Sequence, residues 1–352
     1  MATPPFRWVG VQIYMTDTAA NFEILNLADA LGCMNVGDAG RHTPFSTQPF
    51  LLLDARGAVS DAESLRLIAW LTQRPCPVIG IATDEDNSAL IRACDARVAS
   101  VAEAASLIAN IRQSPIAATA LVQLLRLNAR LPLADALVAE SLAYSTLQAG
   151  PEFKRWLDEN RAAAPAVHRD SGDAVLMTRE DNALTLELNR ASNRNGMTVE
   201  MRDALIEALQ LVLADDSITR VQLSGRGKCF STGGDLTEFG SAPDPATAHI
   251  VRSLALPGRL LAQCSERVSV KVHGACIGSG IEFPAFAGRL LATEDAYFQL
   301  PELKFGLIPG AGGTVSIARR MGRQRAAWWM LSGKRIDARK ALSWGLVDEI
   351  SA

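Results

Sequence analysis

Short apolar runs alternate with longer amphipathic stretches in the first hundred residues of the chain. The runs at 50–54, 77–81 and 97–101 have the length and composition of buried strands. Between the first two, residues 61–72 begin with acidic positions and place apolar side chains at helical spacing, which predicts a helix. This alternation is typical of β-α-β units with parallel strands.

From residue 102 to residue 159 the pattern changes to Ala- and Leu-rich segments with helical spacing. Pro115, Pro132 and Pro151 divide this region, and each stands where a helix would begin. The small, polar, proline-containing segment 162–173 comes next, and its composition predicts a linker.

After this linker the alternation of strands and helices resumes. Strands are predicted at 183–189, 219–224, 268–273 and 297–299, and helices at 199–214, 246–264, 315–321, 323–332 and 338–343. We therefore divide the chain into an α/β segment (1–101), a helical segment (102–161), a linker (162–173) and a second α/β part (174–352).

The chain has 352 residues, with 35 Lys or Arg and 38 Asp or Glu, which gives a formal net charge of −3. This balance argues against nucleic acid as the main partner, because phosphate backbones are bound by basic surfaces. No apolar run reaches the roughly 18 residues of a membrane span, and the first residues lack the pattern of a signal peptide, so we expect a cytoplasmic protein without membrane contacts. The six cysteines form no CxxC pair and the four histidines stand alone, so we expect reduced thiols and no metal site.

Three glycine-rich segments carry the candidate chemistry. Residues 225–235 (GRGKCFSTGGD) follow a predicted strand, and their glycines let backbone N–H groups approach a ligand closely. Residues 274–282 (GACIGSGIE) lead from a strand into a helix, whose first N–H groups suit a developing negative oxygen. Residues 298–314 place Glu302 beside Pro301, ahead of another glycine run. Taken singly, these segments also fit an ordinary loop, a favourable acid at a helix start, and a surface acid.

Together and in this order, the segments resemble the enoyl-CoA hydratase/isomerase (crotonase) superfamily over residues 181–351. LELNRASNRNGM resembles the opening strand and the turn that contacts CoA, while VQLSGRGKCFSTGGDL and KVHGACIGSGIEF resemble the two oxyanion-hole segments. FQLPELKFGLIPGAGGT resembles the segment with the second acid, and SGKRIDARKALSWGLVDEI the stretch after it. The resemblance implies an α/β fold with a crotonase-like ββα-repeat (ClpP/crotonase) core, here preceded by an N-terminal α/β plus helical region.

The resemblance also implies the role of each site residue. The backbone N–H groups of Gly234 and Ser279 would form the oxyanion hole, with Ser279 standing where the family usually has glycine. Glu282 is expected to activate water and Glu302 to protonate the substrate, although the same geometry would allow the two roles to be exchanged. The substrate-binding positions are Gly233, Gly278, Gly280 and Pro301, together with Arg190 and Arg194 as candidates for the CoA nucleotide, which are otherwise solvated surface arginines.

The implied function is that of an acyl-CoA-processing enzyme of the kind found in fatty acid metabolism, an enoyl-CoA hydratase (a lyase) that adds water across a 2-enoyl-CoA. The alternatives are an isomerase or an acyl-CoA hydrolase of the same fold, and a non-catalytic acyl-CoA-binding protein. Two retained acids favour hydration. CoA enters as part of the substrate, so no separate cofactor is expected, and the family's assembly implies a homo-oligomer, a trimer or a dimer of trimers.

Family members usually continue for several helices beyond the matched pattern, and residues 102–161 resemble that missing tail. Residues 89–100 (ALIRACDARVAS) resemble part of the family's core, including a Cys94-Asp95 pair that the second half replaces by Ala287-Gly288. We interpret 1–101 as a degraded, non-catalytic crotonase-like segment, in which 83–87 stand where an oxyanion turn would be. Residues 102–161 are expected to pack on the C-terminal core, as in a circular permutation; the alternative is an independent accessory domain.

Overall fold

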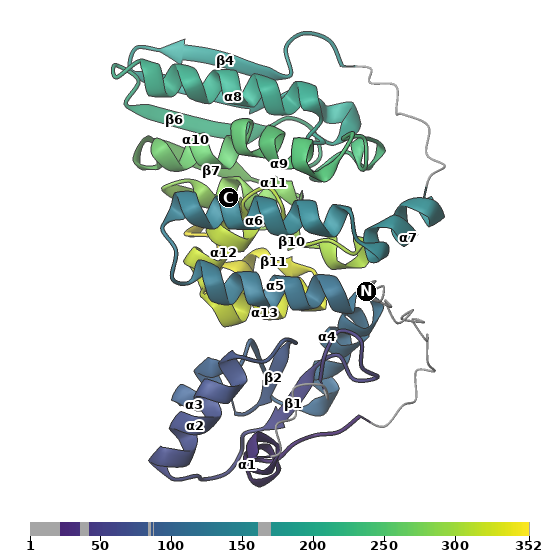
Figure 1. The fold of residues 1–352 in the computed structure, drawn as a ribbon. Helices are drawn as coiled ribbons and strands as arrows, with labels where there is room; N and C mark the ends of the chain where they lie inside the picture. Colours follow the sequence, from purple (N-terminus) through teal and green to yellow (C-terminus); the bar gives the residue numbers. More distant parts are fainter. Residues whose placement is uncertain (1–21, 36–41, 84–85, 87, 161–169, 352) are drawn as a thin grey trace, which may run out of the picture.

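The C-terminal half is built on a six-stranded sheet in which spatial order follows chain order (Figure 1). The computed structural model describes residues 22–35, 42–83, 86, 88–160 and 170–351. The first pair of strands is antiparallel and all later pairs are parallel, so the chain adds one strand with each turn of a spiral. The strands are β4 (Val175–Glu180), β5 (Ala183–Leu188), β6 (Arg220–Gly225), β7 (Val268–Val272), β9 (Arg289–Thr293) and β12 (Glu349–Ser351).

A second, smaller sheet runs beside the first. Its strands, β8 (Ala275–Ile277), β10 (Tyr297–Gln299) and β11 (Ile336–Asp337), lie in the order β11-β10-β8. The strands β8 and β10 follow strands β7 and β9 of the large sheet, and isolated bridges at Ser231–Cys276 and Met197–Gly234 extend the pairing to earlier turns. Each turn is therefore strand, strand, helix, which is the ββα repeat that the sequence predicted.

The helices of this half occupy the positions that their caps and prolines dictate. Thr198 caps α8 by accepting the N–H of Met201, and the helix has the predicted bounds. The single helix predicted at 246–264 is wrong, because Pro257 cannot continue a helix and starts a new one instead. The α-helices are α8 (Val199–Ala214), α9 (Pro245–Leu254), α10 (Pro257–Gln263), α11 (Ser279–Glu282), α12 (Gly313–Met321), α13 (Arg323–Ser332) and α14 (Ala338–Trp344). The 3-10 helices are η1 (Ala191–Asn193), η2 (Leu236–Glu238), η3 (Ser265–Arg267), η4 (Pro284–Phe286) and η5 (Glu302–Phe305).

The N-terminal segment forms a small parallel sheet, as its alternation predicted. Its strands are β1 (Leu51–Asp54), β2 (Val78–Ile81) and β3 (Ala96–Val98), and its helices are α1 (Leu27–Asn35), α2 (Asp61–Thr72) and α3 (Ala89–Ala93). A capping box between Ser60 and Glu63 starts α2 at the predicted residue. The third strand ends earlier than predicted, because Ser100 accepts the N–H of Glu103 and so starts the next helix at Val101.

Four helices then form a layer against the C-terminal half: α4 (Val101–Gln113), α5 (Pro115–Asn128), α6 (Leu133–Gln148) and α7 (Pro151–Asn160). Figure 1 shows α5 and α6 lying across the yellow C-terminal elements, and the residue contacts join them to α12, α13 and α9. One continuous core includes Leu121 and Leu137 from this layer and Ile317 from α12. The described helices and the C-terminal half thus share a single hydrophobic interior.

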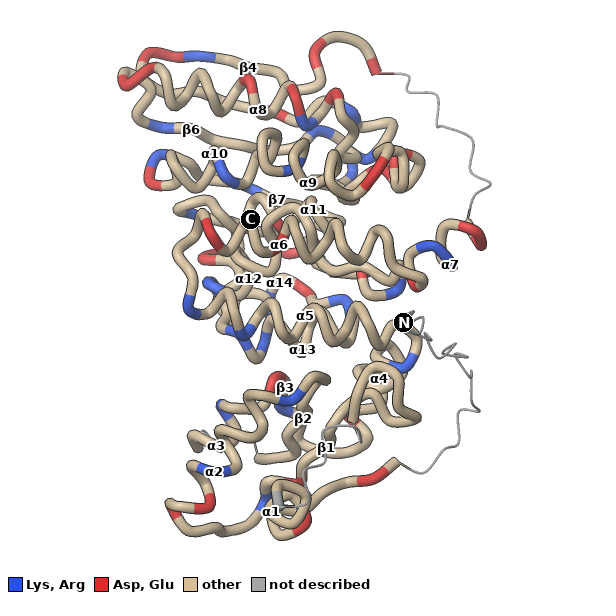
Figure 2. Tube along the Cα trace, viewed as in Figure 1, with Lys and Arg blue, Asp and Glu red and all other residues tan. Residues whose placement is uncertain are grey.

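Most of the predicted linker lies outside the described residues, as does part of segment 83–87. All six cysteines are free thiols, and five of them are buried. Within the described ranges, none of the helices is both long and apolar enough to cross a bilayer. Acidic and basic positions occur together along the chain (Figure 2).

A buried ion-pair network joins the N-terminal sheet to the rest of the molecule. Asp95 is fully buried and accepts hydrogen bonds from the Val78 N–H at 2.9 Å, Arg126 Nε at 2.8 Å and Arg323 Nη1 at 3.0 Å. Arg126 belongs to α5 and Arg323 to α13, so one carboxylate holds three parts of the fold. Removal of one member of such a network leaves the others buried without their charge partner.

We predict that Asp95→Ala lowers the free energy of unfolding by about 3–5 kcal/mol, because Arg126 and Arg323 would remain largely buried without their carboxylate partner. Urea denaturation followed by circular dichroism measures this loss. Asp54→Ala is the matched control, because Asp54 pairs with an Arg56 side chain that is 56% exposed, and it should leave the midpoint unchanged. Equal behaviour of the two variants would contradict the structural role of Asp95.

Candidate active site

Two glycine-rich bends on consecutive turns of the spiral meet at the centre of the C-terminal half. The Ile277 N–H donates to the Ser231 carbonyl at 3.1 Å, and the Ser231 N–H donates to the Ala275 carbonyl at 3.2 Å. A Cβ on Gly233 would lie 2.4 Å from the Ile277 oxygen, and a Cβ on Gly280 would lie 2.4 Å from the Ser231 oxygen. Only glycine fits at both positions, because the two backbones touch there.

The first bend is held in shape by a buried asparagine that the sequence analysis did not single out. Asn195 is fully buried, and its Nδ2 donates to the carbonyls of Arg226 at 2.9 Å and Phe230 at 3.0 Å. The Asn195 carbonyl accepts a hydrogen bond from Ser231 Oγ at 2.7 Å. Ser231 Oγ in turn accepts one from the Gly233 N–H at 3.1 Å. This chain of bonds fixes the direction of the backbone just before Gly234.

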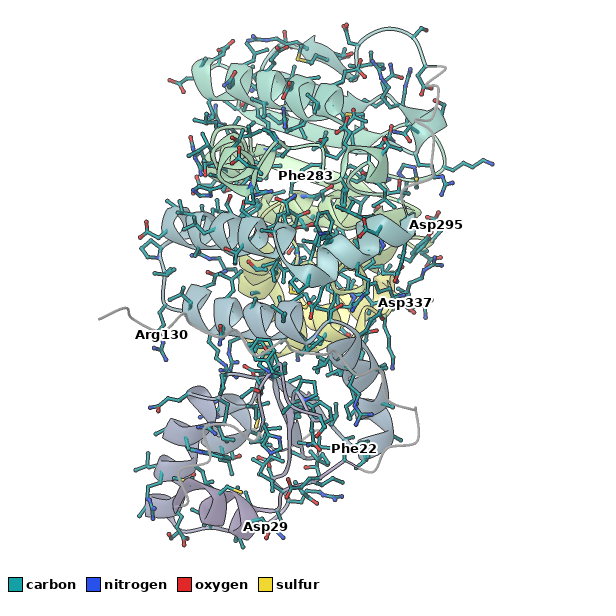
Figure 3. The ribbon with its side chains drawn as sticks, turned by 45° about the vertical axis from the view of Figure 1, so that its right-hand side comes forward. Phe22, Asp29, Arg130, Phe283, Asp295 and Asp337 are labelled. Atoms are coloured by element: carbon teal, nitrogen blue, oxygen red, sulfur yellow. The ribbon has the colours of Figure 1, made fainter. Side chains whose placement is uncertain are left out.

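The second bend leads directly into α11. Gly278 has a φ of +53° and precedes Ser279, the first residue of the helix, whose N–H has no acceptor within the helix. The Cβ position of Gly233 is 3.4 Å from the Ser279 nitrogen, so the two bends are in van der Waals contact. Phe283, labelled in Figure 3, anchors the helix in the core, with its ring centroid 6.0 Å from that of Phe230.

Glu282, at the end of α11, is buried with its carboxylate hydrogen-bonded to a loop. Its exposed fraction is 2%, and Oε2 accepts the N–H groups of Ala311 at 2.8 Å and Gly313 at 3.0 Å. Burial and the neighbouring carboxylates raise the pKa of Glu282 well above its usual range, while the two N–H donors oppose this shift.

Glu302, at the start of η5, is the second buried acid of the site. It is 8% exposed, and the position of a Cβ on Gly278 would be 2.8 Å from its Oε1. Its Oε2 has no hydrogen-bond partner among the described residues. Burial raises the pKa of Glu302 to about 8. Because Glu282 has two N–H donors, we assign the ionised form to Glu282 and the proton to Glu302.

A third buried carboxyl group reaches the same loop from the helical layer. Glu140 of α6 is 1% exposed and accepts from the N–H of Gly312 at 2.7 Å and from the N–H and Oγ1 of Thr314 at 2.8 and 2.6 Å. No local pattern points to Glu140, since an acid within an Ala- and Leu-rich helix is ordinarily on the solvated face.

An aromatic group from three parts of the chain covers the outer side of the site. The Trp156 ring of α7 lies 4.8 Å from the Phe305 ring of η5 and 6.0 Å from the Phe239 ring, centroid to centroid. The Phe239 ring also lies against the first bend, 2.9 Å from the Cβ position of Gly234. The helical layer therefore contacts η5, which begins with Glu302, and reaches the first bend through Phe239.

Residues 178–352 match the family model described as enoyl-CoA hydratase/isomerase. The chain is 32% identical over 176 residues to a 2,3-dehydroadipyl-CoA hydratase of Escherichia coli, which covers 50% of this chain and 68% of the relative. The chain belongs to the enoyl-CoA hydratase/isomerase family. It is an enzyme of the crotonase superfamily. This confirms the family membership and the fold class that the resemblance implied.

Other members of the family carry different activity names. A 1,2-epoxyphenylacetyl-CoA isomerase of Escherichia coli is 33% identical over 181 residues, covering 50% of this chain and 69% of that protein. The crystal structure of an enoyl-CoA hydratase from Thermoplasma volcanium has 30% identity and a TM-score of 0.46, and covers 51% of this chain and 72% of that chain. The curated hydratase and the curated isomerase are thus similarly identical to this chain, at 32% and 33%.

The two arginines predicted to bind the CoA nucleotide lie in different environments. Arg190 is buried, and its guanidinium donates to Glu200 and to the carbonyls of Gly172, Asp173 and Asn189, so a CoA contact would have to replace these bonds. Arg194 is exposed, with a φ of +51° in the turn before the first bend. Of the two, Arg194 is the one whose side chain is exposed.

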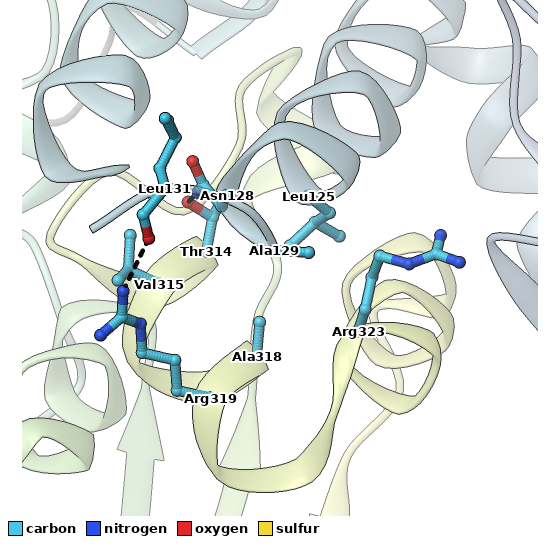
Figure 4. Close-up of a pocket in the computed structure, with 9 residues that line it drawn as sticks. All are labelled: Leu125, Asn128, Ala129, Leu131, Thr314, Val315, Ala318, Arg319 and Arg323. Atoms are coloured by element: carbon cyan, nitrogen blue, oxygen red, sulfur yellow. Dashed lines mark hydrogen bonds between the residues drawn. The ribbon is translucent and has the colours of Figure 1, made fainter. Parts of the chain in front are cut away.

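A cavity of about 290 Å³ lies between α5 and α12 (Figure 4). Its wall includes Asn128, whose Nδ2 donates to Thr314 Oγ1 at 3.1 Å, and Arg319, whose Nη2 donates to the Leu131 carbonyl at 3.1 Å. None of the predicted catalytic or substrate-binding residues lines it, so it is separate from the paired acids.

We predict that Gly233→Ala abolishes turnover, because its Cβ would push the two bends apart by contact with the Ile277 oxygen. Gly345→Ala is the matched control, since Gly345 also has a positive φ (+80°) but its nearest Cβ contact is 3.4 Å. The control should lose about 1–2 kcal/mol of stability from backbone strain alone and retain activity. Steady-state kcat/KM and urea denaturation of both variants test this, and an active Gly233→Ala would contradict the assignment.

Proposed function

We propose that this family member hydrates a 2-enoyl-CoA thioester. The observation that carries the proposal is the pair of buried acids, Glu282 and Glu302, next to two glycine-rich bends that are in contact. One acid of the pair has two N–H donors and the other has an unpartnered oxygen, so the two differ in the way that a base and an acid must differ.

The bends supply the stabilisation of negative charge. In the proposed complex, the thioester carbonyl oxygen lies between the N–H groups of Gly234 and Ser279. Addition of water at Cβ moves electron density through the double bond onto that oxygen, and the fixed N–H groups stabilise the resulting enolate. Loss of one such donor typically costs about 3–4 kcal/mol of transition-state stabilisation.

The acids move the protons. Ionised Glu282 takes a proton from water as the water oxygen bonds to Cβ, and Glu302 gives its proton to Cα as the enolate collapses. One water is added to the acyl group, which carries no net charge before or after the step, and the negative charge of the acid pair moves from Glu282 to Glu302. Each acid is expected to contribute roughly 10²–10⁴-fold to the rate. The pair is then restored when the proton on Glu282 passes to Glu302, either directly or by loss of that proton to solvent and uptake of one by Glu302.

The substrate's remaining parts have candidate neighbours. Exposed Arg194 is proposed to contact the CoA phosphates, and the Trp156, Phe239 and Phe305 rings to bound the acyl group. We propose further that α4–α7 take the place of the helices that follow the matched segment in other members. The packing of this layer on α12 and α13 supports that proposal, as does the third of the relatives' length that the match leaves uncovered. A homo-oligomer remains a prediction.

We predict that the protein converts crotonyl-CoA to 3-hydroxybutyryl-CoA, with loss of absorbance of the conjugated thioester. In ¹⁸O-labelled water, mass spectrometry of the product should show one labelled hydroxyl. A shifted double bond without added water would favour isomerisation, and release of free CoA thiol would favour hydrolysis; either would contradict hydration. Binding without any turnover would favour the non-catalytic alternative.

We predict that Glu302→Gln lowers kcat by roughly 10²–10⁴-fold, because the amide cannot give a proton to Cα. The amide keeps the size of the side chain, so crotonyl-CoA should still bind, as isothermal titration calorimetry would measure. Full activity of Glu302→Gln would remove Glu302 from the mechanism.

We predict a bell-shaped dependence of kcat/KM on pH. The rate falls on the alkaline side at about pH 8, because burial raises the pKa of Glu302 to about 8 and the acid loses its proton above that value. The rate falls on the acid side as Glu282 becomes protonated, at a pH above that of an ordinary glutamate because burial raises the pKa of Glu282. A flat profile from neutral to alkaline pH would contradict Glu302 as the acid.

A further inference from the structure

We propose that Glu140, on α6 of the helical layer, is a positioning residue that fixes the loop 310–314, which includes the first two residues of α12, against Glu282. This inference rests on the proposed function for its kinetic consequences and on the contacts of Glu140 for its structural basis. It gives the N-terminal part of the chain a direct share in the active site, 142 positions before the nearest catalytic acid along the sequence.

The first argument is the way that the loop's N–H groups alternate between two carboxylates. Ala311 and Gly313 donate to Glu282, whereas Gly312 and Thr314 donate to Glu140. Four successive backbone donors are thus shared between one acid of α11 and one acid of α6. A loop held on both sides keeps its donors on Glu282 in one place, as preorganised electrostatic stabilisation requires.

The second argument is the burial of Glu140. A glutamate that merely decorated a helix would be exposed, whereas this one is 1% exposed and accepts three hydrogen bonds. Bonds from N–H and O–H donors to an ionised carboxylate are roughly twice as strong as those to a neutral group. Burial raises the pKa of Glu140 to about 7, and the Thr314 and Gly312 donors lower it.

The third argument is that α6 is itself anchored next to the loop. The Tyr144 ring fills the space beside Gly310, where a Cβ would lie 2.2 Å from the ring. Arg252 of α9 lies over that ring at 4.3 Å and donates to Ser145 Oγ at 3.0 Å. The helix therefore cannot withdraw Glu140 without breaking contacts on both of its neighbours.

Charged and titratable groups face Glu140 from several elements that pack around it. They are Glu282 of α11, Glu302 of η5, Arg252 of α9 and Tyr144 of α6 itself. The negative charge of Glu140 raises the pKa of both Glu282 and Glu302. Neutralising Glu140 should therefore lower the pKa of Glu302, whereas Glu282 would also lose part of the hold on its Ala311 and Gly313 donors, which acts in the opposite direction.

The test is Glu140→Gln in the full-length protein. The amide keeps one acceptor for the Gly312 N–H but presents a donor to Thr314, so we expect kcat to fall on the order of 10–100-fold with KM changed less than threefold, as for misplacement of a catalytic group. The alkaline limb of the pH profile, which Glu302 sets, should move to lower pH because the charge of Glu140 raises the pKa of Glu302. A purely structural glutamate would lower stability in urea and leave kcat and the alkaline limb unchanged, which would overturn the proposal.

Glu152→Gln is the matched control. Glu152 is also buried (3% exposed) and also accepts two backbone N–H groups, of Ile116 at 2.8 Å and Ala117 at 2.9 Å, but these belong to α5 and not to the loop. The Glu152→Gln variant should lose stability but keep the kcat and the pH profile of the wild type.

A second probe is Thr314→Val, which removes one hydrogen-bond donor while Glu140 keeps its charge. The kcat of Thr314→Val should fall, whereas Thr314→Ser, which keeps the hydroxyl, should retain the wild-type kcat.

A readout without turnover separates this inference from the proposed function. Carboxyl ¹³C NMR of protein labelled at the glutamate side chain should show a signal with a raised pKa that disappears in Glu140→Gln, while the signal of Glu302 titrates at lower pH. If the wild-type enzyme fails to hydrate crotonyl-CoA, the proposed function fails, and this titration still tests Glu140. An unmoved titration of Glu302 would overturn the inference even if hydration is observed.

Discussion

The contact between backbones of consecutive turns is the constraint on which the rest of the structure depends. The Ser231 and Ile277 segments pair edge to edge, and Gly233 and Gly280 leave no room for a side chain between them. Because every turn repeats the order strand, strand, helix, equivalent bends stack on one another. The distance between the two proposed oxyanion donors is thus a product of the spiral's main-chain pairing, and the side chains around it only stabilise that arrangement.

The N-terminal helices contact the proposed site, whose other parts are all C-terminal. They bring a carboxylate to the loop 310–314 and an aromatic ring to η5. Both contacts cover interior groups of the C-terminal half. An independent accessory domain would not share one core with the domain it accompanies, as this layer does.

The sequence predicted most of what depends on local signals. The helices at 61–72, 199–214 and 323–332 have the predicted bounds because caps, prolines and apolar spacing act within a few residues. Glu282 and Glu302 were predicted from the family resemblance, and the structure buries both. The strands β4, β8, β9, β11 and β12 were not predicted, and three of them, β8, β11 and β12, have only two or three residues, too few for a periodicity.

Roles that depend on distant partners were harder to predict. Arg190 was interpreted as a ligand contact, but Glu200 and three carbonyls occupy it. Glu140 was not predicted, because its hydrogen-bond donors, the N–H groups of Gly312 and Thr314, lie more than 170 positions away in the sequence. A single sequence shows which residue types are present, and only the fold shows which of them are brought together.

The order of the segments has a consequence for how the protein is made. The helices α5 and α6 leave the ribosome before α12 exists, so Leu121 and Leu137 are synthesised long before Ile317, with which they share one core. Contacts that span so much chain form slowly and leave apolar surface uncovered during synthesis. We therefore expect an early intermediate of the nascent chain in which the apolar faces of α5 and α6 are still exposed.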